Sequence, residues 1–135
     1  MQGLYSYKDE VRHKLDKWNR DNEILALGLY SCFCGRGNIQ KDKQKYIKAA
    51  ADICGLKPGS FRMKLSNIAF LERKNYGKIS SGFSPLESFS KQNEVVFKEL
   101  FHNKAELRRQ AEIIIAAAPS DYFLQKNILQ PLLAG

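Results

Sequence analysis

The sequence lacks a long apolar run and has no apolar core near its beginning. No stretch approaches the roughly 20 consecutive apolar residues that a membrane-spanning helix needs. Residues 1–9 also lack the apolar core of a secretion signal. We therefore expect a soluble, cytoplasmic protein with no membrane partner.

Cysteine and histidine are scarce. The three cysteines, Cys32, Cys34 and Cys54, form no even disulfide framework and would stay reduced in the cytoplasm. Cys32 and Cys34 are spaced C-x-C, but a zinc site needs four donors, and His13 and His102 lie far away in sequence. Neither cysteine of the pair has a neighbouring histidine that would activate it as a nucleophile. We expect no metal, no cofactor and no catalytic centre, and hence a protein that is not an enzyme.

What the chain has is a positive charge concentrated in one segment. The formal net charge is +8 and the pI is about 9.5. Residues 36–78 contain eleven basic and three acidic residues, whereas the rest of the chain contains eleven of each. A single lysine-rich helix is often only a solvated face, but an excess confined to one segment favours a polyanionic partner.

Apolar residues recur at helical spacing along the chain, and no convincing period-two alternation indicates a sheet. We therefore predict an all-α fold, a compact multi-helix domain over residues 1–135 that contains a helix-turn-helix-like pair. Asp21 or Asn22 is the predicted cap of the second helix, and Ser60 that of the fourth. The predicted helices span about residues 8–18, 20–32, 41–54, 61–73, 91–102 and 104–118, followed by one from the Pro119-Ser120-Asp121 turn to Leu133, and residues 76–90 are predicted to form a loop.

The helices 41–54 and 61–73 flank a glycine-bearing turn, Gly55 to Gly59, and carry most of the basic residues. This is the plan of a helix-turn-helix, whose second helix lies in the major groove of DNA while the first braces against the backbone. Helical spacing puts Phe61, Leu65 and Ile68 on an inward face, and Met63 is also assigned to the core. Arg62, Ser66 and Arg73 share a face about 100° round the helix.

The candidate contacts have side chains suited to their roles. Arg62 is able to donate a paired hydrogen bond to a guanine edge, and Ser66 to contact a base or a phosphate. Ser60 and Phe61 offer backbone amides at a helix start, which is a phosphate site. Asn67 is expected to be buried and to bond the neighbouring loop. The residues assigned to phosphate contacts are Lys41, Lys45, Lys48, Lys57, Lys64, Arg73 and Lys74.

Several motifs resemble the N-terminal region of HNH-type restriction endonucleases. The resemblance covers residues 18–101, and its most specific part is Met63-Lys64-Leu65-x-Asn67. Its other parts are Leu25-Ala26-Leu27-Gly28-Leu29-Tyr30, the Ala51 to Leu71 segment, Gly82-Phe83, Ser88-Phe89-Ser90-Lys91 and Val96-Phe97. The resemblance implies a DNA-recognition module that precedes a nuclease, but the clustered histidines of an HNH centre are absent from this sequence. Lys57 stands where the family often has threonine, and residues 104–133 form a helical extension outside the match.

The leading hypothesis is a module that binds double-stranded DNA, taken from a restriction–modification or phage-defence nuclease or acting as a phage or bacterial regulator. The alternative is an interaction protein that inhibits a nucleic-acid-processing complex by placing its basic face on a protein partner. RNA binding is a third hypothesis. It would need a different binding mode, because the major groove of A-form RNA is too narrow to admit a recognition helix. The target sequence, any modified base that is read, and homodimer formation stay open.

Overall fold

The structure is a computed structural model that describes residues 18–35 and 41–134. These residues form helices without any strand, which confirms the predicted all-α class. The predicted first helix, residues 8–18, lies outside the described residues except for Trp18. The helices are α2 (Arg20–Phe33), α3 (Lys43–Cys54), α4 (Pro58–Tyr76), α5 (Lys91–Leu100), α6 (Lys104–Ala117), the short 3₁₀ helix η2 (Ser120–Tyr122) and α7 (Phe123–Ala134).

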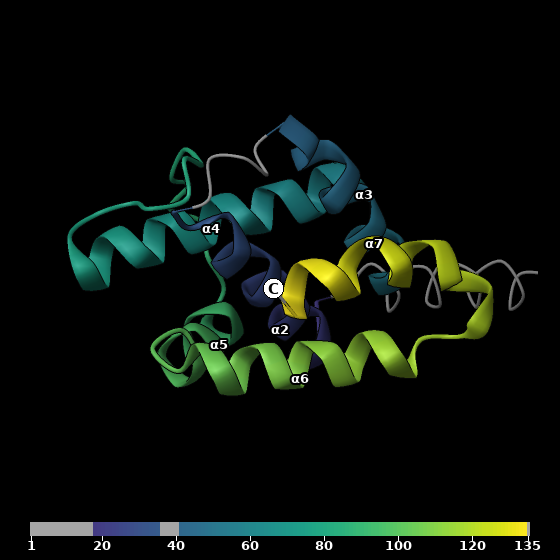
Figure 1. Ribbon diagram of the computed structural model, residues 1–135. Coiled ribbons are helices and arrows are strands. Elements are labelled where there is room, and N and C mark those ends of the chain that lie inside the picture. Colours follow the sequence, from purple (N-terminus) through teal and green to yellow (C-terminus); the bar gives the residue numbers. More distant parts are fainter. Residues whose placement is uncertain (1–17, 36–40, 135) are drawn as a thin grey trace, which may run out of the picture.

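Helix α2 forms the centre of the domain, with α4 and α6 on opposite sides of it and α7 crossing beside it (Figure 1). Every residue from Asn22 to Phe33 is buried, because this helix is apolar around nearly its whole circumference. Gly28 allows α6 to approach closely, since a Cβ atom at that position would lie 3.0 Å from the Cβ of Ala111. The surrounding helices therefore pack on a central rod.

The ends of two helices differ from the predictions. Asn19 caps α2, accepting a hydrogen bond from the Asn22 amide at 2.8 Å, so neither predicted residue is the cap. Helix α4 begins at Pro58 rather than after Ser60, because proline has a helix-compatible φ and needs no amide partner in the first turn.

The turn between α3 and α4 is consequently only three residues long, Gly55 to Lys57. Gly55 takes the left-handed conformation, with φ of 71°, and its amide bonds the carbonyls of Ala51 and Asp52. The small residues Ala49, Ala50 and Ala51 are buried, which lets α3 approach its neighbours closely. The turn therefore has the length that joins the two helices of a helix-turn-helix.

The core of α4 follows the predicted face with one exception. Phe61, Leu65 and Ile68 are fully buried, as predicted. Met63 is 56% exposed, so its assignment to the core is wrong. The reason is geometric, because two residues after Phe61 correspond to about 200° of helical rotation, away from the core.

Residues 79–90 form a covering segment that runs back along α4 (Figure 1). The Leu86 amide donates to the Ser66 carbonyl at 3.0 Å, and the Asn67 side-chain amide donates to the Leu86 carbonyl at 2.8 Å. The expectation that Asn67 is buried and bonds the loop is thus confirmed. The middle of the outer face of α4 lies under this segment.

A buried carboxylate holds the start of the covering segment. Glu72 on α4 accepts hydrogen bonds from the Tyr30 hydroxyl at 2.6 Å, the Ser80 amide at 3.1 Å and the Ser80 hydroxyl at 2.5 Å. Burial and the hydrogen bond to Glu72 raise the pKa of the Tyr30 hydroxyl, which stays a donor. This network ties together α2, α4 and the covering segment.

Candidate nucleic-acid interface

Lys64 lies inside the domain and not on its surface. Its Nζ atom is 3.0 Å from Oε2 of Glu23, and only 6% of the Lys64 side chain and none of the Glu23 side chain is exposed. Lys64 follows Phe61 by three residues, which places it on the inward stripe of α4. The prediction that Lys64 contacts phosphate is therefore wrong, because its charge is already neutralised in the core.

The Glu23 carboxylate has a second partner on α5. The Asn93 side-chain amide donates to Oε1 of Glu23 at 3.0 Å, so one carboxylate joins α2, α4 and α5. Burial raises the pKa of Glu23, while the Lys64 ammonium and the Asn93 amide oppose that shift. This network was not predicted from the sequence. The sequence does contain one indication of it, because Glu23 directly precedes the apolar run Ile24 to Tyr30 and is therefore placed to be buried with it.

The lysines of α3 share one exposed stripe. Lys45 and Lys48 on α3 and Lys41 just before it are exposed, and their spacing of four and three residues puts them on one side together with Gln44. Lys41 and Lys45 form no ion pair among the described residues. Lys48 pairs with Asp52 at 3.4 Å at the surface, where such a pair is weak.

Arg62 connects this stripe to α4. Its side chain is exposed and its guanidinium donates to the side-chain carbonyl of Gln44, on the first turn of α3. Lys57 is also exposed, at the end of the three-residue turn. We call the five exposed cations of α3, α4 and the residues just before each of them the basic edge, which consists of Lys41, Lys45, Lys48, Lys57 and Arg62.

Backbone amides add to the basic edge at the start of α4. The Phe61 amide donates to the Lys57 carbonyl at 3.1 Å. The prediction that this amide is available to a phosphate is therefore wrong. Gly59 and Ser60 precede this first hydrogen bond of the helix, and both residues are exposed. Their amides are the ones that point outward from the helix start, where an anion is favoured.

The other predicted contacts of α4 lie elsewhere. Ser66 is half-buried beneath Leu86, and Arg73 lies about 16 Å along the helix axis from Arg62 at 1.5 Å per residue. Lys74 pairs with Glu94 on α5 at 3.2 Å and lies over the Phe89 ring. The predicted continuous basic face is therefore divided by the covering segment.

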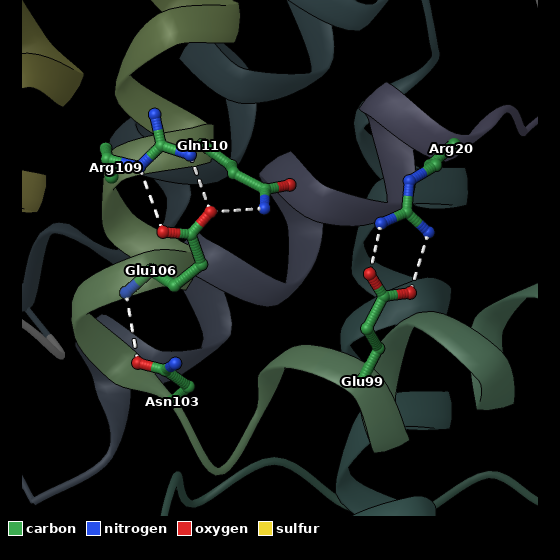
Figure 2. Close-up of polar contacts among 6 residues, drawn as sticks. All are labelled: Arg20, Glu99, Asn103, Glu106, Arg109 and Gln110. Atoms are coloured by element: carbon green, nitrogen blue, oxygen red, sulfur yellow. Dashed lines mark hydrogen bonds and ion pairs between the residues drawn. The ribbon is translucent and has the colours of Figure 1, made fainter.

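Three cations on the α5–α6 side of the domain, Arg20, Lys98 and Arg109, are paired with carboxylates. Arg20 forms two hydrogen bonds with Glu99, at 3.0 and 2.6 Å, and Arg109 forms two with Glu106, at 2.9 and 2.6 Å (Figure 2). Hydrogen bonds from Arg109 and Gln110 lower the pKa of Glu106 to about 2. These arginines are bound by carboxylates of the same chain, whereas Lys48 is the only cation of the basic edge that has a carboxylate partner among the described residues.

The cysteines give no sign of a reactive or metal-binding centre in the described part of the chain. Burial raises the pKa of the Cys54 thiol to about 12 and also raises that of Cys34, so both stay protonated near neutral pH. Among the described residues, no three histidine, cysteine or acidic side chains cluster as metal ligands would. None of the described helices has the length and apolar character to cross a membrane.

Comparisons with protein-family models, with curated proteins and with solved structures found no match for this chain. The resemblance of its motifs to the N-terminal region of HNH-type restriction endonucleases stays a prediction.

Proposed function

We propose that this chain is a non-enzymatic DNA-binding module that holds duplex DNA against its basic edge. The observation that carries the proposal is a set of exposed cations on α3 and α4 and just before each of them, of which only Lys48 is paired to a carboxylate within the described part of the chain. Exposed cations without partners release counterions when they contact phosphates, and this release drives non-specific affinity for duplex DNA.

The exposed part of α4 defines the pose that we propose. Recognition helices contact bases with their N-terminal residues, and α4 is exposed from Pro58 to Ser60 and at Arg62 and Met63. Arg62 then faces the base edges, and the amides of Gly59 and Ser60 face a phosphate. The lysines of α3 contact the adjacent backbone, as the first helix of such a pair does.

A second candidate function is inhibition of a nucleic-acid-processing complex through a protein contact. It is favoured by two exposed apolar side chains on α7, Phe123 at 58% and Leu124 at 62% exposure. Leu124 lines a pocket of about 210 Å³ between α3 and α7 whose other side includes Lys45 and Lys48. Such a protein would bind its partner stoichiometrically and bind free duplex DNA weakly.

Fluorescence anisotropy of a labelled duplex over a salt series tests the proposal. Four phosphate contacts, from Lys41, Lys45, Lys48 and Lys57, predict that log K falls with log salt with a slope of about −3.6, and the K41A/K45A/K48A variant should lose about 2.7 of that slope. Lys98→Ala on α5 is the matched single-charge control, because Lys98 is exposed and paired with Glu94. A flat salt series, or equal affinity for an RNA duplex of the same length, would contradict DNA binding through this edge.

A further inference from the structure

A pocket of about 270 Å³ opens beside the first turns of α4. One wall is a stripe of α4 residues at positions i, i+3, i+4 and i+7, which face the same direction. The opposite wall is the end of the covering segment, and Trp18 closes the pocket. The lining residues are Trp18, Ser60, Met63, Lys64, Asn67, Ser88 and Ser90.

The apolar part of the lining suits a flat ring. Trp18 is half-buried and held in place, since its ring centroid is 5.6 Å from that of Phe61 and 4.7 Å from the Lys64 ammonium. Met63 brings an exposed thioether to the pocket. An indole and a polarisable thioether both make favourable contacts with aromatic rings.

The polar part of the lining favours a neutral ring with N–H donors. The side-chain N–H group of Asn67 donates a hydrogen bond to the Leu86 carbonyl, so the Oδ1 atom of Asn67 is the acceptor that it offers to the pocket. Ser60 and Ser88 add hydroxyl groups to the wall. Lys64 brings no net charge, because Glu23 neutralises it at 3.0 Å. An anion would therefore find little attraction in the pocket itself.

We propose that this pocket receives a single nucleobase extruded from the duplex, and specifically one of the bases that carry an exocyclic amine, which are adenine, cytosine and guanine. The inference rests on the proposed DNA-binding function. Ser60 and Met63 belong both to the pocket and to the exposed turns of α4, and Met63 lies about 9 Å along the helix axis from Lys57. A base in the pocket would thus keep its flanking phosphates beside the basic edge, and stacking plus hydrogen bonding to its edge is how extruded bases are held.

Equilibrium binding to four duplexes tests this inference. One duplex is fully paired, and the others carry a central adenine, cytosine or thymine opposite an abasic site, which lowers the cost of extrusion. We expect adenine and cytosine to bind about tenfold tighter than the fully paired duplex and several-fold tighter than thymine, which lacks the exocyclic amine. The thymine duplex controls for the extra flexibility of DNA at an abasic site.

Two matched variants locate the effect. Ser88→Phe places a ring in the pocket, whereas Ser84→Phe makes the same change at an exposed position of the covering segment that does not line it. The preference for adenine and cytosine should disappear in S88F and persist in S84F, with affinity for the paired duplex unchanged in both. Equal binding of all four duplexes, or a preference that survives in S88F, overturns the pocket assignment alone. Failure to bind even the fully paired duplex overturns the proposed function as well.

Discussion

The two ends of α4 carry similar residues and have different surroundings. At the N-terminal end, Lys57 and Arg62 are exposed and form no ion pair among the described residues. At the C-terminal end, Arg73 lies over the Phe70 ring and Lys74 is paired with Glu94. Between them, Lys64 is buried against Glu23. Basic residues on one helix thus have three different environments.

The difference arises from what packs on the helix. The covering segment reaches α4 at Ser66 and continues past Phe70, whose ring stacks on that of Phe89 at a centroid distance of 5.7 Å. Near the first turns of α4, its end lies across the pocket lined by Ser60, Met63, Ser88 and Ser90. At the N-terminal end neither Lys57 nor Arg62 is paired with a carboxylate among the described residues, whereas at the C-terminal end Lys74 is paired and Arg73 stays exposed over the Phe70 ring.

The largest effect is expected for the buried cation of α4. Lys64→Met leaves the Glu23 carboxylate buried without its counter-charge, which should lower the free energy of unfolding by about 3–5 kcal/mol. Urea denaturation measures it, with exposed Lys41→Met as the matched control, for which about 0.5 kcal/mol or less is expected. The double variant E23Q/K64M should recover most of the loss. Wild-type stability in K64M would show that the pair does not hold α2 to α4.

The same pair predicts a pH dependence. The pKa of Glu23 is raised above its usual 4.5, so the folded chain keeps a proton that the unfolded chain releases. The stabilisation that comes from this bound proton is therefore fully present below pH 4.5, and it is lost as the pH rises through the raised pKa of Glu23. Wild-type stability relative to E23Q/K64M should fall in urea denaturation as the pH rises above the usual pKa of this carboxyl, 4.5. A constant difference would contradict the shift.

Removing two cations from one end of α4 or from the other tests the comparison directly. K57A/R62A and R73A/K74A remove the same number of charges from one helix. The first should weaken duplex binding by about tenfold or more, since one base contact alone is worth about 1–3 kcal/mol, and the second by less than about threefold. Anisotropy at constant salt measures both. Equal losses would mean that total charge, and not the basic edge, determines binding.

Detaching the covering segment should have an intermediate effect on stability. Asn67→Ala leaves the Leu86 carbonyl without its donor, which should lower stability by about 1–3 kcal/mol and speed amide exchange in residues 79–90. Asn75→Ala is the matched control, because Asn75 donates to the Leu71 carbonyl of its own helix at 2.8 Å and is exposed. Unchanged exchange rates in N67A would show that other contacts hold the segment.

The smallest effect is expected on the α5–α6 side. Glu99→Gln releases Arg20 from the pair in Figure 2 and adds a free cation away from the basic edge. Duplex affinity should change by less than about twofold, because a charge distant from the bound phosphates is screened. A gain as large as the loss in a single basic-edge variant would break the distinction between the two regions.

The sequence by itself determined the helices, because their 3.6-residue apolar period and their glycine and proline ends are local properties. The faces of α4 that hold Phe61 and Arg62 also followed from this period, as did the buried role of Asn67. The predicted start of α4, Phe61, lies three residues after the observed start, Pro58. The prediction placed Pro58 in the turn, although proline is favoured in the first turn of a helix.

Only the tertiary structure decided which cations are available. The pairing of Lys64 with Glu23 and the covering of Ser66 by Leu86 join residues 41 and 20 positions apart, and no local pattern encodes such contacts. Charge counts sum over residues regardless of burial, whereas binding depends on the cations that remain exposed and unpaired. For this reason the sequence predicted a basic segment, and the packing reduced it to a basic edge with a pocket beside it.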